Sequence, residues 1–158
     1  MIALIYNACT ASMTNPIVLL YMANETAFSY QQYVYSYTVT STTMILNFAF
    51  RQDPSYFAMD DVYVNDTVTG LTVNSDPSFE SGTLNCCSLC NPSGSAAGGQ
   101  ISSSYPHTGT YSYFDGAVGN PDYLILTLSV VPGRTYSISF WLENLGNPTN
   151  SVTVLVSS

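Results

Sequence analysis

Short apolar or alternating segments recur along the chain, and turn-forming residues separate them. Pro16–Met22 is a continuous apolar run, whereas Gln32–Val39 alternates. In Arg134–Leu142 the residues Tyr136, Ile138, Phe140 and Leu142 fall on one face, the two-residue period of a strand with one buried side. Further segments of strand length are Met44–Phe50, Tyr56–Val64, Thr110–Phe114, Tyr123–Ser129 and Ser151–Ser157.

Turn chemistry lies between these segments, at Asp53-Pro54, Asn120-Pro121-Asp122, Pro132-Gly133 and Gly146-Asn147-Pro148. We also expect a hairpin at Thr40–Thr43, and long loops around short strands between Asn74 and Tyr105. No amphipathic helix is indicated. The pattern predicts one all-β domain over residues 16–158, a jelly roll or β-sandwich of about ten strands.

The first fifteen residues form a separate N-terminal strand and linker in this interpretation. The strand is apolar on both faces, which favours burial in the middle of a sheet; it consists of Ile2, Ala3, Leu4, Ile5 and Tyr6. The small-residue stretch Ala8–Asn15 follows as a linker. The strand either folds back into its own sheet or extends a sheet of a neighbouring copy, as in donor-strand addition. The second option is a head-to-tail contact, which propagates into a filament unless it closes a ring.

Composition narrows the classes of partner. Charged residues make up only 8% of the 158 residues, and polarity comes instead from 21 serines and 17 threonines. The only cations among the side chains that are always charged are Arg51 and Arg134, and the net charge is −8. Such a chain lacks the basic surface that nucleic acids or anionic membranes attract. No apolar run reaches the length of a membrane span.

Two glycosylation sequons and an even number of cysteines favour a secreted, extracellular protein. The sequons begin at Asn24 and Asn65, both next to predicted strand ends. The start of the sequence does not resemble a signal peptide, so we interpret the chain as a mature form or a fragment.

The four cysteines are Cys9, Cys86, Cys87 and Cys90. Structural disulfides are favoured over a zinc site, because the CxxC lies in a loop and a fourth ligand would have to come from Cys9 or His107. A vicinal Cys86–Cys87 bond is disfavoured, so we expect Cys9 to join one of the cluster. If the N-terminal strand inserts into a neighbour, that disulfide could instead link subunits.

Four short motifs resemble those of galactose-binding-like jelly rolls, the fold of many carbohydrate-binding modules. Asp76–Gly82 is similar to the opening N-P-x-F-E-x-G, and Thr108–Ser112 to the S-G-x-Y-S turn. Gly133–Leu142 is similar to the G-x-T-Y-x-L-S-F-W strand, and Ala58–Val64 to the closing D-D-V-x-V strand. The closing strand here precedes the opening motif, so the chain resembles a circularly permuted module. The arrangement is also similar to that of protomers of extracellular, glycosylated helical fibrils.

The resemblance implies a structural Ca²⁺ held by Asp60, Asp61 and Glu80, since related modules bind one where the two motifs meet. Hard oxygen ligands suit Ca²⁺ rather than Zn²⁺. The equally weighted alternative is that these carboxylates only accept backbone hydrogen bonds at turns.

The aromatic residues Tyr33, Tyr35, Tyr37 and Trp141 could stack against sugar rings if they line an open sheet face. The favoured alternative is that they cover the sandwich or pack between subunits. Trp141 falls on the polar side of its strand, which indicates exposure or a subunit contact.

No catalytic constellation is recognised. His107 reads as a turn residue, and Asp60 and Asp61 are expected on opposite faces of a strand, where they cannot act on one bond as a pair. The sequence therefore predicts a non-enzymatic, glycosylated extracellular building block that polymerises through its N-terminal strand. The alternative is a calcium-stabilised carbohydrate-binding module.

Overall fold

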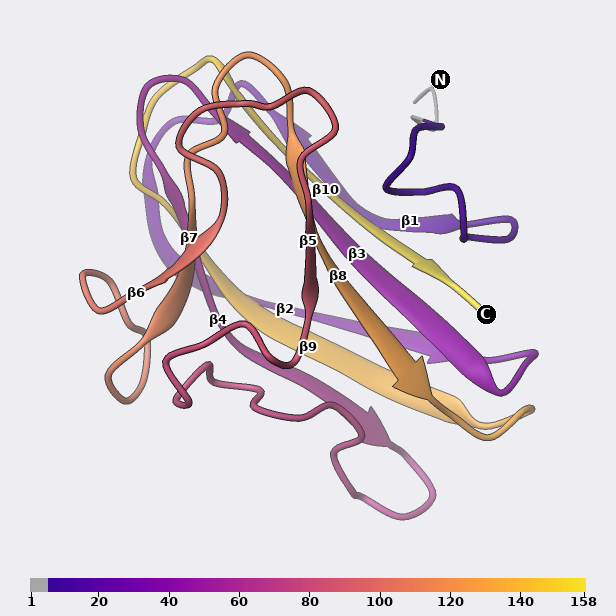
Figure 1. Cartoon of the computed structure of the whole chain (residues 1–158). Coiled ribbons are helices and arrows are strands. Elements are labelled where there is room, and N and C mark those ends of the chain that lie inside the picture. Colours follow the sequence, from indigo (N-terminus) through magenta and orange to yellow (C-terminus); the bar gives the residue numbers. More distant parts are fainter. Residues whose placement is uncertain (1–5) are drawn as a thin grey trace.

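A computed structural model describes residues 6–158 as a sandwich of two antiparallel five-stranded sheets (Figure 1). The first sheet has the order β1 (Ile17–Ala23), β10 (Asn150–Ser157), β3 (Thr43–Gln52), β8 (Asp122–Ser129) and β5 (Ser88–Cys90). The second has the order β2 (Phe28–Thr38), β9 (Thr135–Asn144), β4 (Phe57–Asp66), β7 (Ser112–Asp115) and β6 (Gln100–Ser102). The all-β class and the ten strands expected from the sequence are confirmed. Residues 6–158 contain no helix of the length and apolarity that a membrane crossing requires.

Within residues 6–158, successive strands alternate between the two sheets except β6 and β7, which lie in the same sheet and pair. The hairpin expected at Thr40–Thr43 is therefore wrong, since β2 and β3 belong to different sheets. The connection crosses one end of the sandwich instead. There the Val39 N–H donates to the carbonyl of Arg134, and Thr42 accepts from the Val130 N–H, both at 3.0 Å.

The residues that the sequence pattern places on one face of each strand form the core. The residues of β9 alternate between buried and half-buried along the whole strand, with Tyr136, Ile138, Phe140 and Leu142 inside. Phe48 of β3 meets Phe140 edge-on across the sandwich at 5.2 Å between ring centroids. Burial of such side chains contributes about 25 cal/mol per Å² of apolar surface, which makes this interior the main source of stability.

The sandwich has two flanks that differ in their strands. At the long-edge flank, the edge strands β1 and β2 are joined by the short loop 24–27, and the Tyr37 hydroxyl lies 3.1 Å from that of Ser158, just after β10. At the short-edge flank, β5 and β6 have three residues each and are flanked in the sequence by long loops.

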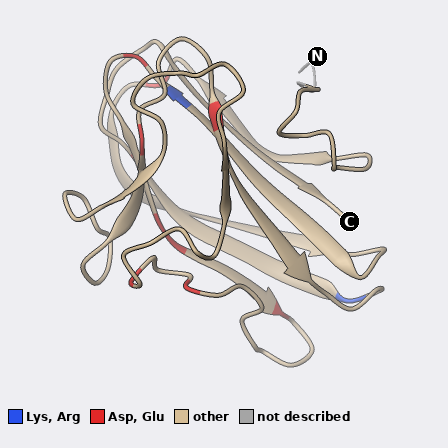
Figure 2. Ribbon diagram, in the orientation of Figure 1, with Lys and Arg blue, Asp and Glu red and all other residues tan. Residues whose placement is uncertain are grey.

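Charged side chains are few, and the cations are paired (Figure 2). The two arginines lie at opposite ends of the sandwich. The guanidinium of Arg51 is 2.5 Å from Asp53, and that of Arg134 is 2.5 Å from the buried Asp66. The strands β1 and β2 contain no charged residue.

Candidate functional site

The segment before β1 is fastened to the outer face of the first sheet. Cys9 is buried and forms a disulfide with Cys90 of β5, with 5.7 Å between the Cα atoms. The Asn47 side chain of β3 donates to the Cys9 carbonyl at 3.0 Å. Asn7 donates to the Tyr123 hydroxyl of β8 at 2.7 Å. The linker expected over residues 8–15 is thus packed and covalently held in its first half.

Tyr6 is the first described residue, and its side chain is 74% exposed. Of the proposed self-assembly strand, Ile2, Ala3, Leu4 and Ile5 lie outside the described residues. The anchor at Asn7 and Cys9 therefore marks the point at which this segment meets the domain.

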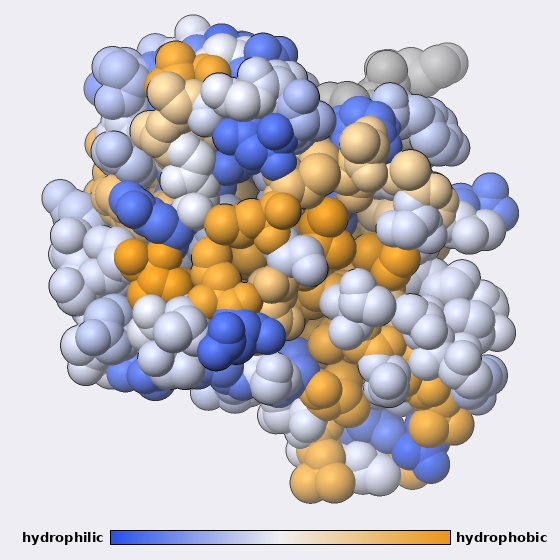
Figure 3. Space-filling view, in the orientation of Figure 1, coloured by the Kyte–Doolittle hydropathy of each residue, from blue (hydrophilic) through white to orange (hydrophobic). Residues whose placement is uncertain are grey.

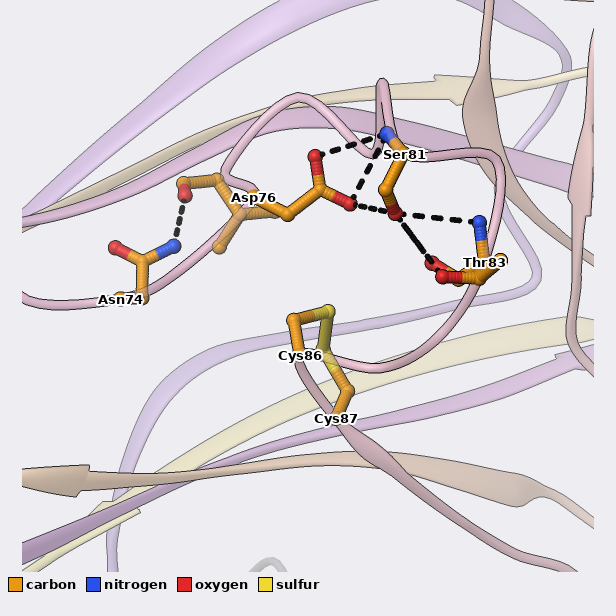
Figure 4. Close-up of a disulfide and its surroundings, with 7 residues drawn as sticks. Asn74, Asp76, Ser81, Thr83, Cys86 and Cys87 are labelled. Carbon is orange, nitrogen blue, oxygen red and sulfur yellow. Dashed lines mark hydrogen bonds between the residues drawn. A yellow bond between two sulfur atoms is a disulfide. The ribbon is translucent and has the colours of Figure 1, made fainter.

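The four cysteines form two disulfides, Cys9–Cys90 and Cys86–Cys87. The expectation that Cys9 pairs with one of the clustered cysteines is confirmed. The expectation that Cys86 and Cys87 do not bond to each other is wrong. Cys90 is the partner because β5 brings it to the outer face where Cys9 packs, which leaves the adjacent pair to each other. Figure 4 shows this pair beside a loop in which the Asp76 carboxylate accepts from the Ser81 N–H and hydroxyl.

Asp60 and Asp61 anchor a loop to the outer face of the second sheet. The Asp60 Oδ2 atom accepts from the N–H groups of His107 and Thr108 at 2.8 and 3.0 Å. Asp61 accepts from the Thr108 hydroxyl at 2.7 Å and from the Ser78 hydroxyl at 2.9 Å.

The expectation that these two aspartates point to opposite faces is wrong. The register between β4 and β9 shifts at this point, and Asp61 has a φ of 51°. Such a β-bulge inserts an extra residue and re-aims its side chain. Both carboxylates consequently reach the same loop.

The two aspartates have different pKa values, because the balance between burial and hydrogen bonding differs between them. It raises the pKa of Asp60 to about 6, with backbone hydrogen bonds opposing the shift. Burial also acts on Asp61, but hydrogen bonds from His107, Thr108 and Ser78 outweigh it and lower its pKa below the usual value. The two adjacent carboxyls are thus held in unlike environments.

Glu80 supports the other side of the same loop. Its carboxylate accepts from the N–H groups of Thr110 and Tyr111 at 2.9 to 3.0 Å. Gly109 has a φ of +63°, and a Cβ atom there would collide with the Glu80 carboxyl group. The Thr108–Ser112 motif therefore needs its glycine both for conformation and for space.

The oxygens of Asp60, Asp61 and Glu80 do not fit a calcium cage as they are placed. Each of the six side-chain oxygens faces an N–H, hydroxyl or imidazole group, whereas Ca²⁺ requires oxygens that converge on the ion. Within residues 6–158 no three His, Cys, Asp or Glu side chains are grouped as a metal site requires. The geometry matches the alternative role, acceptors at turns, and calcium binding stays an untested prediction.

An aromatic cluster on the outer face of the second sheet was missed by sequence reasoning. The His107 ring stacks on Trp141 at 4.0 Å between centroids, and its Nδ1 atom is 2.7 Å from Asp61 Oδ2. Tyr30 contacts His107 edge-on at 5.0 Å and donates its hydroxyl to the Tyr105 carbonyl. Burial raises the pKa of Tyr30. The outward position of Trp141 was visible in the strand pattern, but its contact with His107 was not.

The tyrosines of β2 face the interior rather than an open sheet face. Tyr33 and Tyr35 stack on Phe140 at 5.5 and 6.2 Å between centroids. These two tyrosines and Tyr37 are half-buried and pack against the core. They cover the open side of the sandwich, which agrees with the reading favoured from the sequence.

The two sequons differ in accessibility. Asn24 is exposed in the loop between β1 and β2, with a φ of 58°. Asn65 is half-buried within β4, and its side-chain oxygen accepts from the Thr72 hydroxyl at 2.7 Å. We expected both asparagines to be exposed, but of the two only Asn24 is.

A buried acid pair lies near the short-edge flank and was also missed. Asp115 and Asp122 are both almost fully buried, and Tyr113 donates to Asp115 at 2.7 Å. Burial, together with the hydrogen bond to Asp122 and its charge, raises the pKa of Asp115 to about 9. The buried Oδ1 atom of Asp122 has no hydrogen-bond partner among the described residues. This raised pKa favours the protonated form of Asp115 at neutral pH.

Fold and site together define a disulfide-bonded, all-β sandwich module with an N-terminal segment anchored on its outer face. Comparisons with models of known protein families, with curated proteins and with solved structures found no match.

Proposed function

We propose that this chain is a structural, extracellular glycoprotein that assembles into filaments by donor-strand complementation. The segment Ile2–Tyr6 is the donor. The observation that supports this most is the anchor at Cys9, because it fixes the chain on the outer face of the first sheet a few residues after the apolar segment. An apolar strand in that position finds burial in another copy.

The surface supports close packing of copies. Both arginines are already paired with aspartates, and β1 and β2 contain no charge. Little electrostatic repulsion therefore opposes contact between subunits at these strands.

Extracellular location and glycosylation are supported by two further observations. All four cysteines are in disulfides, which persist in oxidising compartments. The Asn24 sequon is exposed, as an acceptor for a glycan needs to be.

Negative-stain electron microscopy of the full chain tests the proposal. We expect filaments from the unaltered chain, and monomers from a variant lacking residues 1–6 and from Leu4→Asp/Ile5→Asp. Ala11→Asp is the matched control, because Ala11 is exposed and follows the anchor, and it should still form filaments. An unaltered chain that stays monomeric, or a truncated chain that polymerises, would contradict the proposal.

A carbohydrate-binding module is the second proposal, and the outer-face cluster of Trp141, His107 and Tyr30 supports it; the placement of the carboxylates does not support the calcium that the resemblance implies. Partly exposed aromatic rings provide the stacking surface that sugars use. A glycan array with and without Ca²⁺ tests it, with Trp141→Ala as the variant expected to lose binding. Signals at background under both conditions would exclude this function.

A further inference from the structure

We propose that the outer edge of β2 is the acceptor site, and that it pairs with residues 1–6 of a second copy of this chain. This inference rests on the proposed function, which names the donor strand, and it adds the surface that receives that strand.

The edge of β2 lacks the features that normally prevent strand addition. It is eleven residues long, and its sequence FSYQQYVYSYT has no charge, proline or glycine. Natural edge strands are usually short, charged or interrupted by proline, because an unprotected edge pairs with other chains. Val34 is 59% exposed on the solvent face of this strand. After the irregularity between Phe28 and Gln31, pairing with β9 runs in regular register to Thr38.

The inner side of the same strand is incompletely covered. Tyr33 and Tyr35 stack on Phe140 but remain half-buried, since no strand among residues 6–158 lies beyond β2 in its sheet. Side chains of β1, Leu19 and Leu20, are also only partly buried against the core. An apolar strand added to β2 would cover these groups from the open side.

The other edges fit a donor less well. The register of β1 with β10 shifts between Val18 and Leu20, and bulges of this kind interrupt pairing. The strands β5 and β6 have three residues each. The regular part of β2 alone matches a donor of six residues.

The donor comes from a second copy because its own anchor holds it too far away. Asn7 is bonded to Tyr123 in β8, three strands from β1. Strands are about 4.8 Å apart and sheets about 10 Å apart, so the path around β1 to β2 is about 24 Å. Six extended residues span at most about 21 Å. Nothing would remain to pair along β2.

Charge placed on the acceptor tests the inference. In Val34→Lys/Ser36→Lys both changes are at exposed positions of β2 and leave the inner tyrosines in place. We expect a folded monomer, with association weakened by at least about tenfold, or about 1.4 kcal/mol. Thr127→Lys/Ser129→Lys is the matched control, since both residues are exposed on β8, which is not an edge strand, and it should form filaments. Ser36→Lys alone serves if the double variant does not fold.

Mixing variants identifies the partner surfaces. The acceptor variant keeps its donor, and Leu4→Asp/Ile5→Asp keeps its acceptor, so an equal mixture should yield dimers that do not grow. Sedimentation velocity measures this outcome. If the unaltered chain and the β2 variant both form filaments, the acceptor lies elsewhere while the proposed function stands. If the unaltered chain forms none, the proposed function itself fails.

Discussion

The two flanks of the sandwich expose their edge strands in opposite ways. At the short-edge flank, β5 is held by the Cys9–Cys90 disulfide, and loops cover the ends of the sheets (Figure 1). Apolar side chains still reach the surface across the middle of the face in Figure 3, in the region where β5 runs, and Leu89 is 46% exposed. At the long-edge flank, β1 and β2 have neither a covalent tie nor a charge. The short-edge flank is thus tied within the chain, and we call it the closed flank; the long-edge flank has no such tie, and we call it the open flank.

Removing the covalent tie of the short-edge flank should have the largest effect. Cys9 and Cys90 are 81 residues apart, so their disulfide restricts a long loop of the unfolded chain. We expect Cys9→Ser/Cys90→Ser to lower the free energy of unfolding by about 2–5 kcal/mol, measured by denaturant titration without reductant.

Cys86→Ser/Cys87→Ser is the control for that prediction. It also removes one disulfide, but the pair is adjacent in sequence and closes almost no loop. Its loss should be below about 1 kcal/mol. Equal losses in the two double variants would show that the anchor contributes nothing beyond the bond itself.

The buried acid pair should make the closed flank sensitive to pH. Burial, aided by the neighbouring Asp122, raises the pKa of Asp115 to about 9 in the folded chain, and an unfolded aspartate has a pKa of about 3.9. The folded state therefore holds a proton that the unfolded state releases, and this stability is full below about pH 4 and is lost as the pH rises to 9. We expect the Tm to fall by at least about 5 °C between pH 5 and 9.

Asp115→Asn isolates this contribution, because the amide can donate to Asp122 at every pH. Its Tm should change much less over the same interval, whereas Glu25→Gln, at an exposed position, should keep the slope. An unchanged slope in Asp115→Asn would place the pH dependence elsewhere.

A tyrosine-to-phenylalanine substitution on each flank should give smaller losses of stability, which can be compared directly. Tyr113→Phe removes the hydroxyl that donates to buried Asp115, and we expect a loss of about 1–2 kcal/mol. Tyr37→Phe removes a hydroxyl near Ser158 at the half-exposed open flank, and should cost less than about 0.5 kcal/mol. Thermal denaturation of the two variants side by side decides whether the flanks differ as described.

Much of the fold could be predicted from the sequence, but the pairing of strands could not. The alternation of Tyr136, Ile138, Phe140 and Leu142 reports which face is buried, and the structure confirms it. Periodicity carries no information on partners, so Thr40–Thr43 was read as a hairpin although the chain there changes sheets. Loop length alone does not distinguish the two cases.

The site was predictable only where it depends on local pattern. The outward position of Trp141 follows from its strand. The pairing of Cys9 with the cluster was predicted from the avoidance of a vicinal bond, a reason that the Cys86–Cys87 disulfide contradicts. The contact of His107 with Asp61 joins residues 46 apart in sequence and depends on a bulge that no residue type marks. The raised pKa of Asp115 depends on burial, which its surrounding sequence does not reveal.

The place of β10 between β1 and β3 has a consequence for synthesis. Until residues 150–157 leave the ribosome, β1 and β3 lack the strand that lies between them. The apolar surface that Val152, Val154 and Val156 later cover stays exposed to solvent until then. Contacts between segments so distant in sequence form slowly. The nascent polypeptide thus stays incomplete until this late segment has emerged, which delays any association of copies until each has closed its own sheet.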